Sequence, residues 1–218
     1  MAEAKSETLP CAADALHTNA MAAPNGAAWK MGGADYYGLR QAISEVGRSV
    51  LTPGSRVVDL RCDLGLLMPL VEENEDLCRF TLLSPRGEDA WNCFDRMRTR
   101  VRLGFVDAAI LDLKEGFPEI SARMFLAVDA LGALTVARRT EVAEAMRRRL
   151  ERCGAGVVVE EVEPDADDVA IRHPSSVDRP RRRRWSPMEW ESLLNSAGFR
   201  TVERIWSDGD RVAWLVRK

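Results

Sequence analysis

The residues best suited to chemistry follow a short apolar segment in the first third of the chain. Two valines after Pro53-Gly54 predict a buried strand, and Asp59 follows them. A helix is predicted directly after the turn by the apolar positions Leu66, Leu67, Leu70 and Val71. In an open parallel sheet, ligands bind outside the carboxyl ends of the strands, at the loop that leads into the first helix. Residues 59–65 are therefore the first candidate for a ligand-binding loop.

The elements that position this loop alternate between strand and helix. Strands are predicted over residues 78–84, 101–106 or a little beyond, 123–131 and 156–160. Helices are predicted over 39–50 and 88–98, and from Val142 through Leu150 to an end at Cys153-Gly154. A further helix begins with Ser186 as N-cap, Pro187 in its first turn and Glu189 three residues after the cap, and it ends at Gly198. Two strands, 199–206 and 211–216, flank the turn signal Ser207-Asp208-Gly209-Asp210 and predict an antiparallel hairpin. Together these segments predict an α/β fold with a mostly parallel sheet.

Length and composition indicate one globular domain with a tail. The chain has 218 residues, 46% hydrophobic, and a net charge of −3. Residues 1–28 are rich in alanine without apolar periodicity, and predict a flexible N-terminal tail, either disordered or a docking arm that orders on a partner; residues 29–218 form the domain. No segment reaches membrane-spanning length and no secretory leader is evident, so we expect a cytoplasmic protein that binds no membrane.

Metal and disulfide chemistry are not expected. The five cysteines are scattered without C-x-x-C spacing, and their odd number favours reduced thiols. The chain has two histidines, which leaves few candidates for a zinc site or for acid–base catalysis by histidine. The balanced charge does not indicate extensive nucleic-acid binding, although a local basic patch could still contact phosphates.

The loop itself resembles a known motif. The pattern Asp59-Leu60-x-Cys62-x-Leu64-Gly65 is similar to the first motif of class I S-adenosylmethionine-dependent methyltransferases, and most similar to the tRNA wobble-uridine carboxymethyl-transferase family and its bacteriophage relatives. The pattern Leu150-x-x-x-Gly154-x-x-Val157-Val158-Val159 and the lead-in Ala197-Gly198-Phe199 extend the resemblance over residues 30 to 218. It implies a Rossmann-like fold, with a mostly parallel seven-stranded sheet and a C-terminal antiparallel hairpin, and S-adenosylmethionine as cofactor without a metal.

The resemblance also implies a set of cofactor-binding residues. Arg61 stands where the family has glycine, and Ser84 ends the strand at which related folds place an acid for the ribose. Asp107 flanks Ile110 at the adenine position, and Asp129 or Val128 ends the strand beside the methyl donor. The remaining implied contacts are Tyr37 (or Tyr36) before the first helix and the loop residues Asp59, Cys62, Asp63 and Gly65.

Departures at Arg61, Ser84, Ile110 and Val128 leave three interpretations open. In a working methyltransferase, Arg61 would meet the carboxylate of the methionine moiety, and Asp63 or Asp129 its amino group. In a divergent, inactive relative, Arg61 with Leu82, Leu83 and Ile110 would fill the pocket, and the protein would act as a binding or assembly module through its surface and tail. In the third interpretation, Arg61 binds a different anionic nucleotide ligand.

A change of charge follows the fifth predicted strand. An acidic stretch at 161–168 precedes an arginine run that includes Arg181, Arg182, Arg183 and Arg184. The run could contact the phosphates of an RNA substrate. The alternative is a solvated loop, or a partner for the acidic stretch before it. The sequence therefore leaves both RNA and protein open as partners.

Overall fold

A computed structural model describes residues 36–61, 64–74, 77–84, 106–163 and 184–218. Its helices are α1 (Tyr36–Val50), α2 (Leu64–Asn74), α4 (Val136–Arg149) and α5 (Pro187–Ser196). Its strands are β1 (Arg56–Asp59), β2 (Arg79–Ser84), β3 (Val106–Ile110), β4 (Ala122–Val128), β5 (Leu150–Glu161), β6 (Thr201–Ser207) and β7 (Arg211–Arg217). The predicted tail, residues 1–28, and the predicted helix 88–98 lie outside the described residues.

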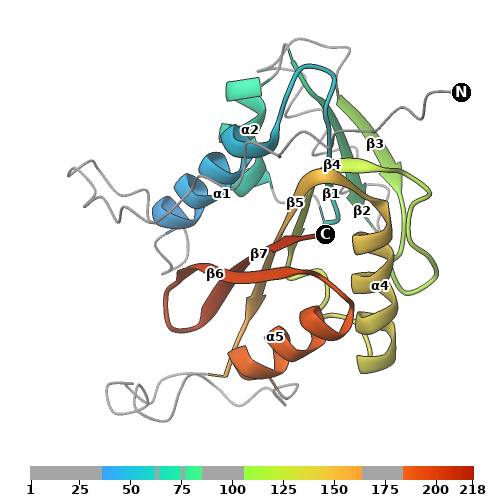
Figure 1. Ribbon diagram of the computed structural model, residues 1–218, viewed down its shortest axis with the longest axis vertical. Helices are drawn as coiled ribbons and strands as arrows, with labels where there is room; N and C mark the ends of the chain where they lie inside the picture. Colours follow the sequence, from blue (N-terminus) through green and yellow to red (C-terminus); the bar gives the residue numbers. More distant parts are fainter. Residues whose placement is uncertain (1–35, 62–63, 75–76, 85–105, 164–183) are drawn as a thin grey trace, which may run out of the picture.

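The strands form one seven-stranded sheet in the order β3-β2-β1-β4-β5-β7-β6 (Figure 1). Strands β1 to β5 pair in parallel, while β7 is antiparallel to both β5 and β6. The mostly parallel seven-stranded sheet with its C-terminal hairpin is therefore confirmed. The strand order reverses between β1 and β4, and in open α/β sheets such a reversal creates a crevice at the carboxyl ends of the strands.

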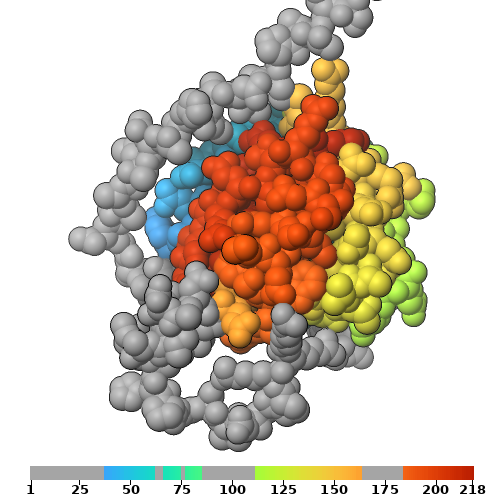
Figure 2. All heavy atoms as spheres, turned by 60° about the horizontal axis from the view of Figure 1, so that its bottom comes forward, coloured from blue at the N-terminus to red at the C-terminus, as the bar shows by residue number. Residues whose placement is uncertain are grey.

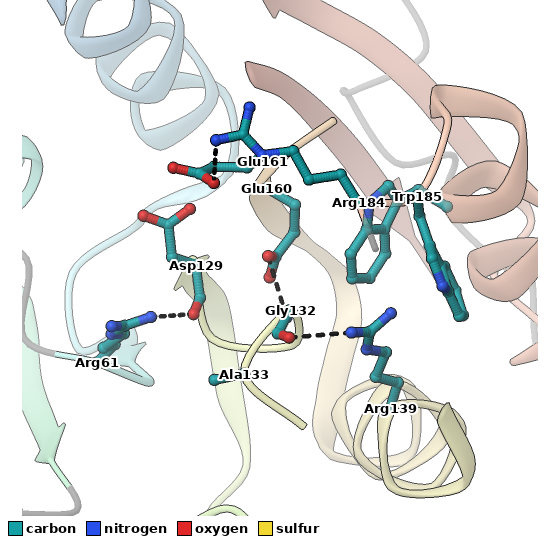
Figure 3. A pocket seen from close by; sticks show the side chains of 10 residues that line it. Arg61, Asp129, Gly132, Ala133, Arg139, Glu160, Glu161, Arg184 and Trp185 are labelled. Atoms are coloured by element: carbon teal, nitrogen blue, oxygen red, sulfur yellow. Dashed lines mark hydrogen bonds and ion pairs between the residues drawn. The ribbon is translucent and has the colours of Figure 1, made fainter. Parts of the chain in front are cut away.

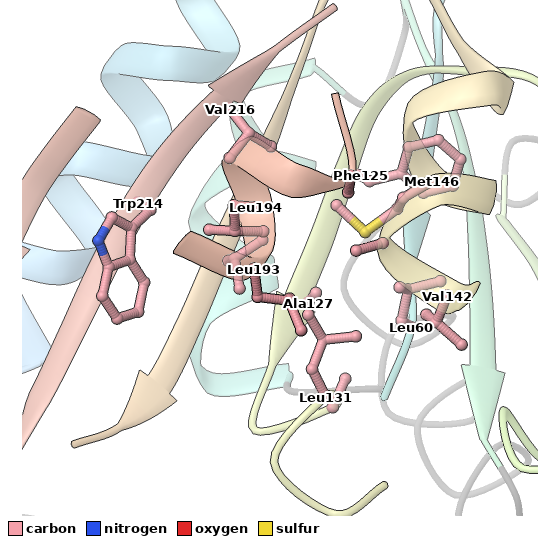
Figure 4. Close-up of a cluster of buried hydrophobic side chains, with 14 of the residues drawn as sticks. Leu60, Phe125, Ala127, Leu131, Val142, Met146, Leu193, Leu194, Trp214 and Val216 are labelled. Atoms are coloured by element: carbon pink, nitrogen blue, oxygen red, sulfur yellow. The ribbon is translucent and has the colours of Figure 1, made fainter. Parts of the chain in front are cut away.

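Helices cover both faces of the sheet, and each face has its own buried cluster. On one face, α1 and α2 lie side by side and bury Leu39, Ile43 and Leu70 against the strands. On the other face, α4 and α5 pack over Phe125 and Trp214 (Figure 4). Figure 2 shows the atoms of α5 and the terminal hairpin adjoining those of α4 as one continuous surface. Because both faces are covered, the middle positions of the central strands are mostly apolar.

The start of α5 follows its predicted capping box. The Ser186 hydroxyl accepts a hydrogen bond from the backbone N–H of Glu189 at 3.3 Å, and the Glu189 carboxylate accepts one from the backbone N–H of Ser186 at 2.8 Å. Both N–H groups would otherwise lack a partner within the helix. This box directs the chain from Trp185 into α5 and so fixes one wall of the site described below.

Two local predictions were wrong, and a third, the end of the third strand, is now given its bounds. The pair Cys153-Gly154, predicted as a helix end, lies in β5, because α4 already ends at Arg149 and Cys153 takes a left-handed φ of 61° inside the irregular start of the strand. The described third strand runs to Ile110, so that Asp107 lies inside it: the apolar residues after this acid extend the strand. Cys78 is a buried free thiol, but Cys153 is disulfide-bonded, contrary to the expectation of reduced thiols.

No helix within the described ranges is long and apolar enough to cross a bilayer. The longest of them, α1, has 15 residues, whereas a membrane-spanning helix needs about 20 apolar ones.

Candidate functional site

A cavity of about 390 Å³ lies at the carboxyl edge of the sheet (Figure 3). This volume falls within the range of about 300–1,000 Å³ that is usual for small-molecule sites. The lining residues follow β1 and β4, end β5, or come from α4, α5 and the segment before α5: Arg61, Asp129, Gly132, Ala133, Arg139, Glu160, Glu161, Arg184, Trp185 and Trp190. The cavity is therefore walled by cations, carboxylates and two tryptophans.

Arg61 connects the end of β1 to the end of β4. Asp59 is buried at the last position of β1, and its carboxylate accepts a hydrogen bond from the backbone N–H of Arg61 at 3.0 Å. This bond turns the chain sharply as it leaves the strand. The exposed guanidinium of Arg61 then donates a hydrogen bond to the main-chain carbonyl oxygen of Asp129. The cation thus lies across the crevice where the strand order reverses.

Asp129 is held in an unusual backbone conformation directly after β4. Its φ of 47° is in the left-handed region, which is uncommon for residues other than glycine and costs on the order of 1 kcal/mol. The Asp129 N–H donates to the carbonyl oxygen of Val159 at 2.8 Å, and Arg211 of β7 donates to its carboxylate at 3.0 Å. Two strands that follow β4 in the sheet order, β5 and β7, therefore fix this residue.

Glu160 is a buried carboxyl group near the end of β5. Its two oxygens accept hydrogen bonds from the backbone N–H groups of Leu131 at 2.7 Å and Gly132 at 3.0 Å. Burial, followed by the negative charge of Asp129, raises the pKa of Glu160 to about 8, although both N–H groups and the Arg139 charge act in the opposite direction. The group is therefore mostly protonated at neutral pH.

Arg139 contacts the same segment from α4. Its Nε donates to the carbonyl oxygens of Leu131 at 3.1 Å and Leu134 at 3.2 Å, and its Nη2 donates to that of Gly132 at 2.9 Å. The guanidinium carbon lies 4.4 Å from the ring centroid of Trp185 and 5.1 Å from that of Trp190. A cation over an indole ring is attracted by the ring's quadrupole, so the tryptophans hold Arg139 against this loop.

Charged pairs surround the cavity where β5 and β7 meet. Glu161 pairs with Arg184 at 2.9 Å and with Arg211 at 3.7 Å, and Arg184 also lies 4.0 Å from Asp210. Glu161 belongs to the acidic stretch of the sequence and Arg184 to the arginine run, so the two runs contact each other at these residues. The rest of the run, residues 181–183, lies outside the described residues.

Comparison with known proteins rests on structure, because no family model and no curated protein sequence matches the chain. A S-adenosylmethionine-dependent methyltransferase from Clostridium acetobutylicum is similar, with a TM-score of 0.64 and 12% identity over 85% of this chain and 92% of that one. Human N-acetylserotonin methyltransferase in complex with S-adenosylmethionine gives a TM-score of 0.55 and 20% identity over 83% of this chain. The cyclase SpnF gives 0.56 and 20% over 76%.

The chain has the class I methyltransferase fold. It spans nearly the whole Clostridium protein, but only 55% of the human enzyme and 59% of SpnF. All these identities lie at or below 20%, so the likeness concerns the fold.

The methyltransferase fold brings together some of the predicted cofactor residues. Arg61 and Asp129 both line the cavity, and the Asp59 carboxylate positions Arg61 by accepting its backbone N–H. Ser84 is buried at the end of β2 and does not line the cavity, and neither does Tyr37, which is 58% exposed in the first turn of α1. Of the predicted cofactor residues, Arg61 and Asp129 therefore lie in the same cavity.

The other predicted cofactor residues are described only in part. Asp107 pairs with Thr81 between β3 and β2, and Gly65 lies in the first turn of α2. Cys62 and Asp63 lie outside the described residues. Among the residues that the structure does describe, no cluster of histidine, cysteine and acidic side chains could hold a metal ion.

Seven residues that line the cavity were missed from the sequence: Gly132, Ala133, Arg139, Glu160, Glu161, Trp185 and Trp190. One signal was available, because Glu160 directly follows three valines and a polar residue at the carboxyl end of a parallel strand faces the ligand edge. Arg139 gave no signal, since an arginine on a helix normally indicates a solvent-exposed face.

Proposed function

We propose that the protein binds S-adenosylmethionine at the carboxyl edge of its sheet and is a methyltransferase with a divergent cofactor site. The observation that carries this proposal is the meeting of Arg61 and Asp129 in one cavity, from the ends of the two strands between which the order reverses. Ligands of open α/β folds bind at this position. The likeness to solved methyltransferases supports the choice of cofactor.

The chemistry of these two residues fits the methionine end of the cofactor. A guanidinium has five N–H donors in a planar fork, so Arg61 retains donors for a carboxylate beside its bond to Asp129. The Asp129 carboxylate has the charge needed to bind an ammonium group. At the ribose end, where related folds place an acid, β2 ends at Ser84, which is buried and does not line the cavity.

The residues of the chain would bind and orient the reactants. The cofactor, when bound, supplies a methyl group on a sulfonium for direct displacement by a nucleophile of the acceptor. Such a reaction depends mainly on positioning. Arg61, Asp129 and the partly buried loop that follows β4 would fix the cofactor, while Trp185 and Trp190 would keep water from one wall of the cavity.

A second candidate is a non-catalytic binding or assembly module that acts through its surface and N-terminal tail. The bond between the Arg61 guanidinium and the Asp129 carbonyl oxygen favours it, because this bond spans the crevice and would have to share the space with a cofactor. The fold alone does not decide between the two, since one fold hosts many activities and the cyclase SpnF shares this one.

For the acceptor we propose RNA, in keeping with the sequence resemblance to tRNA-modifying enzymes and with the arginine run 181–184. Arg184 is already paired with Glu161, so phosphate contacts would depend on Arg181, Arg182 and Arg183. A protein partner is the alternative, and a binding assay against bulk tRNA tests the choice. The cytoplasm is the compartment that we propose, from the sequence observations given above.

Calorimetric titration of the purified chain with S-adenosylmethionine and S-adenosylhomocysteine tests the proposal. Mass spectrometry of the purified protein checks for ligand carried over from the expression host. We expect micromolar binding of both compounds. Absence of binding at millimolar concentration, with no ligand carried over, would contradict the methyltransferase proposal and favour the second candidate.

A further inference from the structure

The loop between β4 and α4, residues 129–135, is bound by two side chains, the carboxyl group of Glu160 and the guanidinium of Arg139. Glu160 of β5 accepts the backbone N–H groups of Leu131 and Gly132, at 2.7 and 3.0 Å. Arg139 of α4 donates to the carbonyl oxygens of Leu131, Gly132 and Leu134, at 2.9 to 3.2 Å. The N–H groups of the loop thus meet a carboxyl group and its carbonyl groups meet a guanidinium.

Both side chains are themselves fixed. Glu160 is 2% exposed, on a strand that pairs with β4 on one side and β7 on the other. Arg139 is 9% exposed and lies over the rings of Trp185 and Trp190. Polar groups buried to this extent are costly unless they are hydrogen-bonded. The hydrogen bonds to the loop therefore stabilise Glu160 and Arg139 as well as the loop itself.

Gly132 allows the close approach of Glu160. A Cβ atom at this position would lie 2.5 Å from the Oε2 atom of Glu160, well inside van der Waals contact. In Figure 3, Glu160 and Gly132 lie between Arg61 and Asp129 on one side and Arg139 and Trp185 on the other. The contacts are therefore part of the cavity wall.

We propose that Glu160 and Arg139 are positioning residues, which fix the loop so that Asp129 presents its carbonyl oxygen to Arg61 and its carboxylate to the cavity. Asp129 is the first residue of the loop and has a left-handed φ of 47°, a conformation that persists only when its surroundings impose it. The proposal rests on the proposed function, because Asp129 is one of the two residues assigned there to the cofactor.

The arrangement also decides what a ligand can contact. The N–H groups of Leu131 and Gly132 and the carbonyl groups of Leu131, Gly132 and Leu134 are already bound within the protein. The charged group of the loop is the Asp129 carboxylate, which is bound to Arg211 at 3.0 Å and would meet a ligand beside this contact. Binding affinity should then depend on how accurately Asp129 is placed.

Two measurements on the full chain test this proposal. The first is amide hydrogen exchange at Leu131 and Gly132, which needs no ligand. The second is calorimetric affinity for S-adenosylhomocysteine, measured in the unchanged and the Asp129→Asn backgrounds. The variants are Glu160→Gln, Arg139→Lys and Gly132→Ala; the last keeps both charged side chains and serves if either of the others fails to fold. Gly116→Ala is the matched control, because a Cβ atom there meets nothing within 4 Å.

We expect faster exchange at Leu131 and Gly132 in each variant, and affinity at least about tenfold weaker, as loss of a hydrogen bond to a charged group would give. In the Asp129→Asn background the same changes should cost about threefold or less, because the effect acts through Asp129. A purely structural role would weaken binding equally in both backgrounds, which would overturn the proposal, as would unchanged exchange rates. If the unchanged chain binds no cofactor, the proposed function fails, and exchange at the two amides alone decides whether the loop is fixed in this way.

Discussion

The guanidinium of Arg61 donates a hydrogen bond to the main-chain carbonyl oxygen of Asp129, which joins the residues that follow β1 and β4 across the crevice of the sheet. Asp129 is in turn bound to Arg211 of β7 and to Val159 of β5. A ligand that enters between β1 and β4 must therefore use the remaining donors of Arg61 or displace this bond. The two candidate functions differ on this point.

Replacing Arg61 by glycine separates the two candidates. If Arg61 holds the methionine carboxylate, Arg61→Gly should weaken cofactor binding by about tenfold or more, since a hydrogen bond to a charged group contributes about 1.5–3 kcal/mol. If Arg61 instead fills the pocket, the same change should create binding or leave it absent. Calorimetry with S-adenosylhomocysteine distinguishes these results, and Arg79→Ala, at an exposed arginine at the start of β2, is the control.

Glu160 should make the stability of the protein depend on pH. Because its folded pKa of about 8 lies above the ordinary value of 4.5, the folded chain binds more protons than the unfolded chain between these values. Its favourable contribution is fully present below pH 4.5 and is lost as the pH rises through about 8. The free energy of unfolding should fall by up to about 1.4 kcal/mol for each pH unit in this window.

Urea unfolding of the wild type and Glu160→Gln at the two ends of that pH range measures the effect. As the pH rises, the free energy of unfolding of the wild type should fall relative to that of the glutamine variant, because glutamine does not titrate. Glu151→Gln, at an exposed glutamate of the same strand, should show no comparable trend. A wild type and a Glu160→Gln variant with parallel pH profiles would contradict the raised pKa.

The capping box of α5 should contribute measurably to stability. Ser186→Ala removes the acceptor for the Glu189 N–H and should lower the free energy of unfolding by about 1 kcal/mol. Ser192→Ala, at an exposed serine inside the same helix, should be neutral or slightly stabilising because alanine is the better helix former. Thermal unfolding of both variants provides the measurement; equal melting temperatures would show that the cap is dispensable.

Gly154 should resist substitution although it is not at a turn. A Cβ atom there would lie 2.5 Å from the main-chain carbonyl oxygen of Arg123 and 3.0 Å from that of Glu151, and backbone atoms cannot move aside easily. Gly154→Ala should therefore destabilise the protein by about 1–3 kcal/mol, as overpacking does. The denaturant midpoint measures this loss against Gly116→Ala, and equal midpoints would mean that the strands shift apart at little cost.

The fold could be predicted from the sequence because its signals are local. The capping box depends on residues within one helical turn, the hairpin on the turn 207–210, and the buried strands on runs of apolar residues, and the structure contains all three. The start of β5 was missed because Leu150 to Gly154 form an irregular strand segment that follows α4 without a loop, and no local breaker marks the junction.

The candidate site was predicted only where a residue follows an apolar strand directly. Arg61 and Asp129 do so, and both line the cavity. Arg139 and Glu160 are separated by 21 positions and by most of β5, and they meet through a loop whose conformation no sequence pattern encodes. Charged residues that stabilise buried backbone look in the sequence like any exposed charge.

The reversed direction of β7 brings the start of a strand to an edge otherwise made of strand ends. Arg211 therefore reaches Asp129 from immediately beyond the exposed turn 208–210, whose Asp210 also approaches Arg184. Insertions in this turn would leave every pairing of β6 and β7 intact while adding chain directly at the rim of the cavity. The size or charge of the cavity rim can therefore change through the turn 208–210 without any change in the sheet. This turn takes no part in the core.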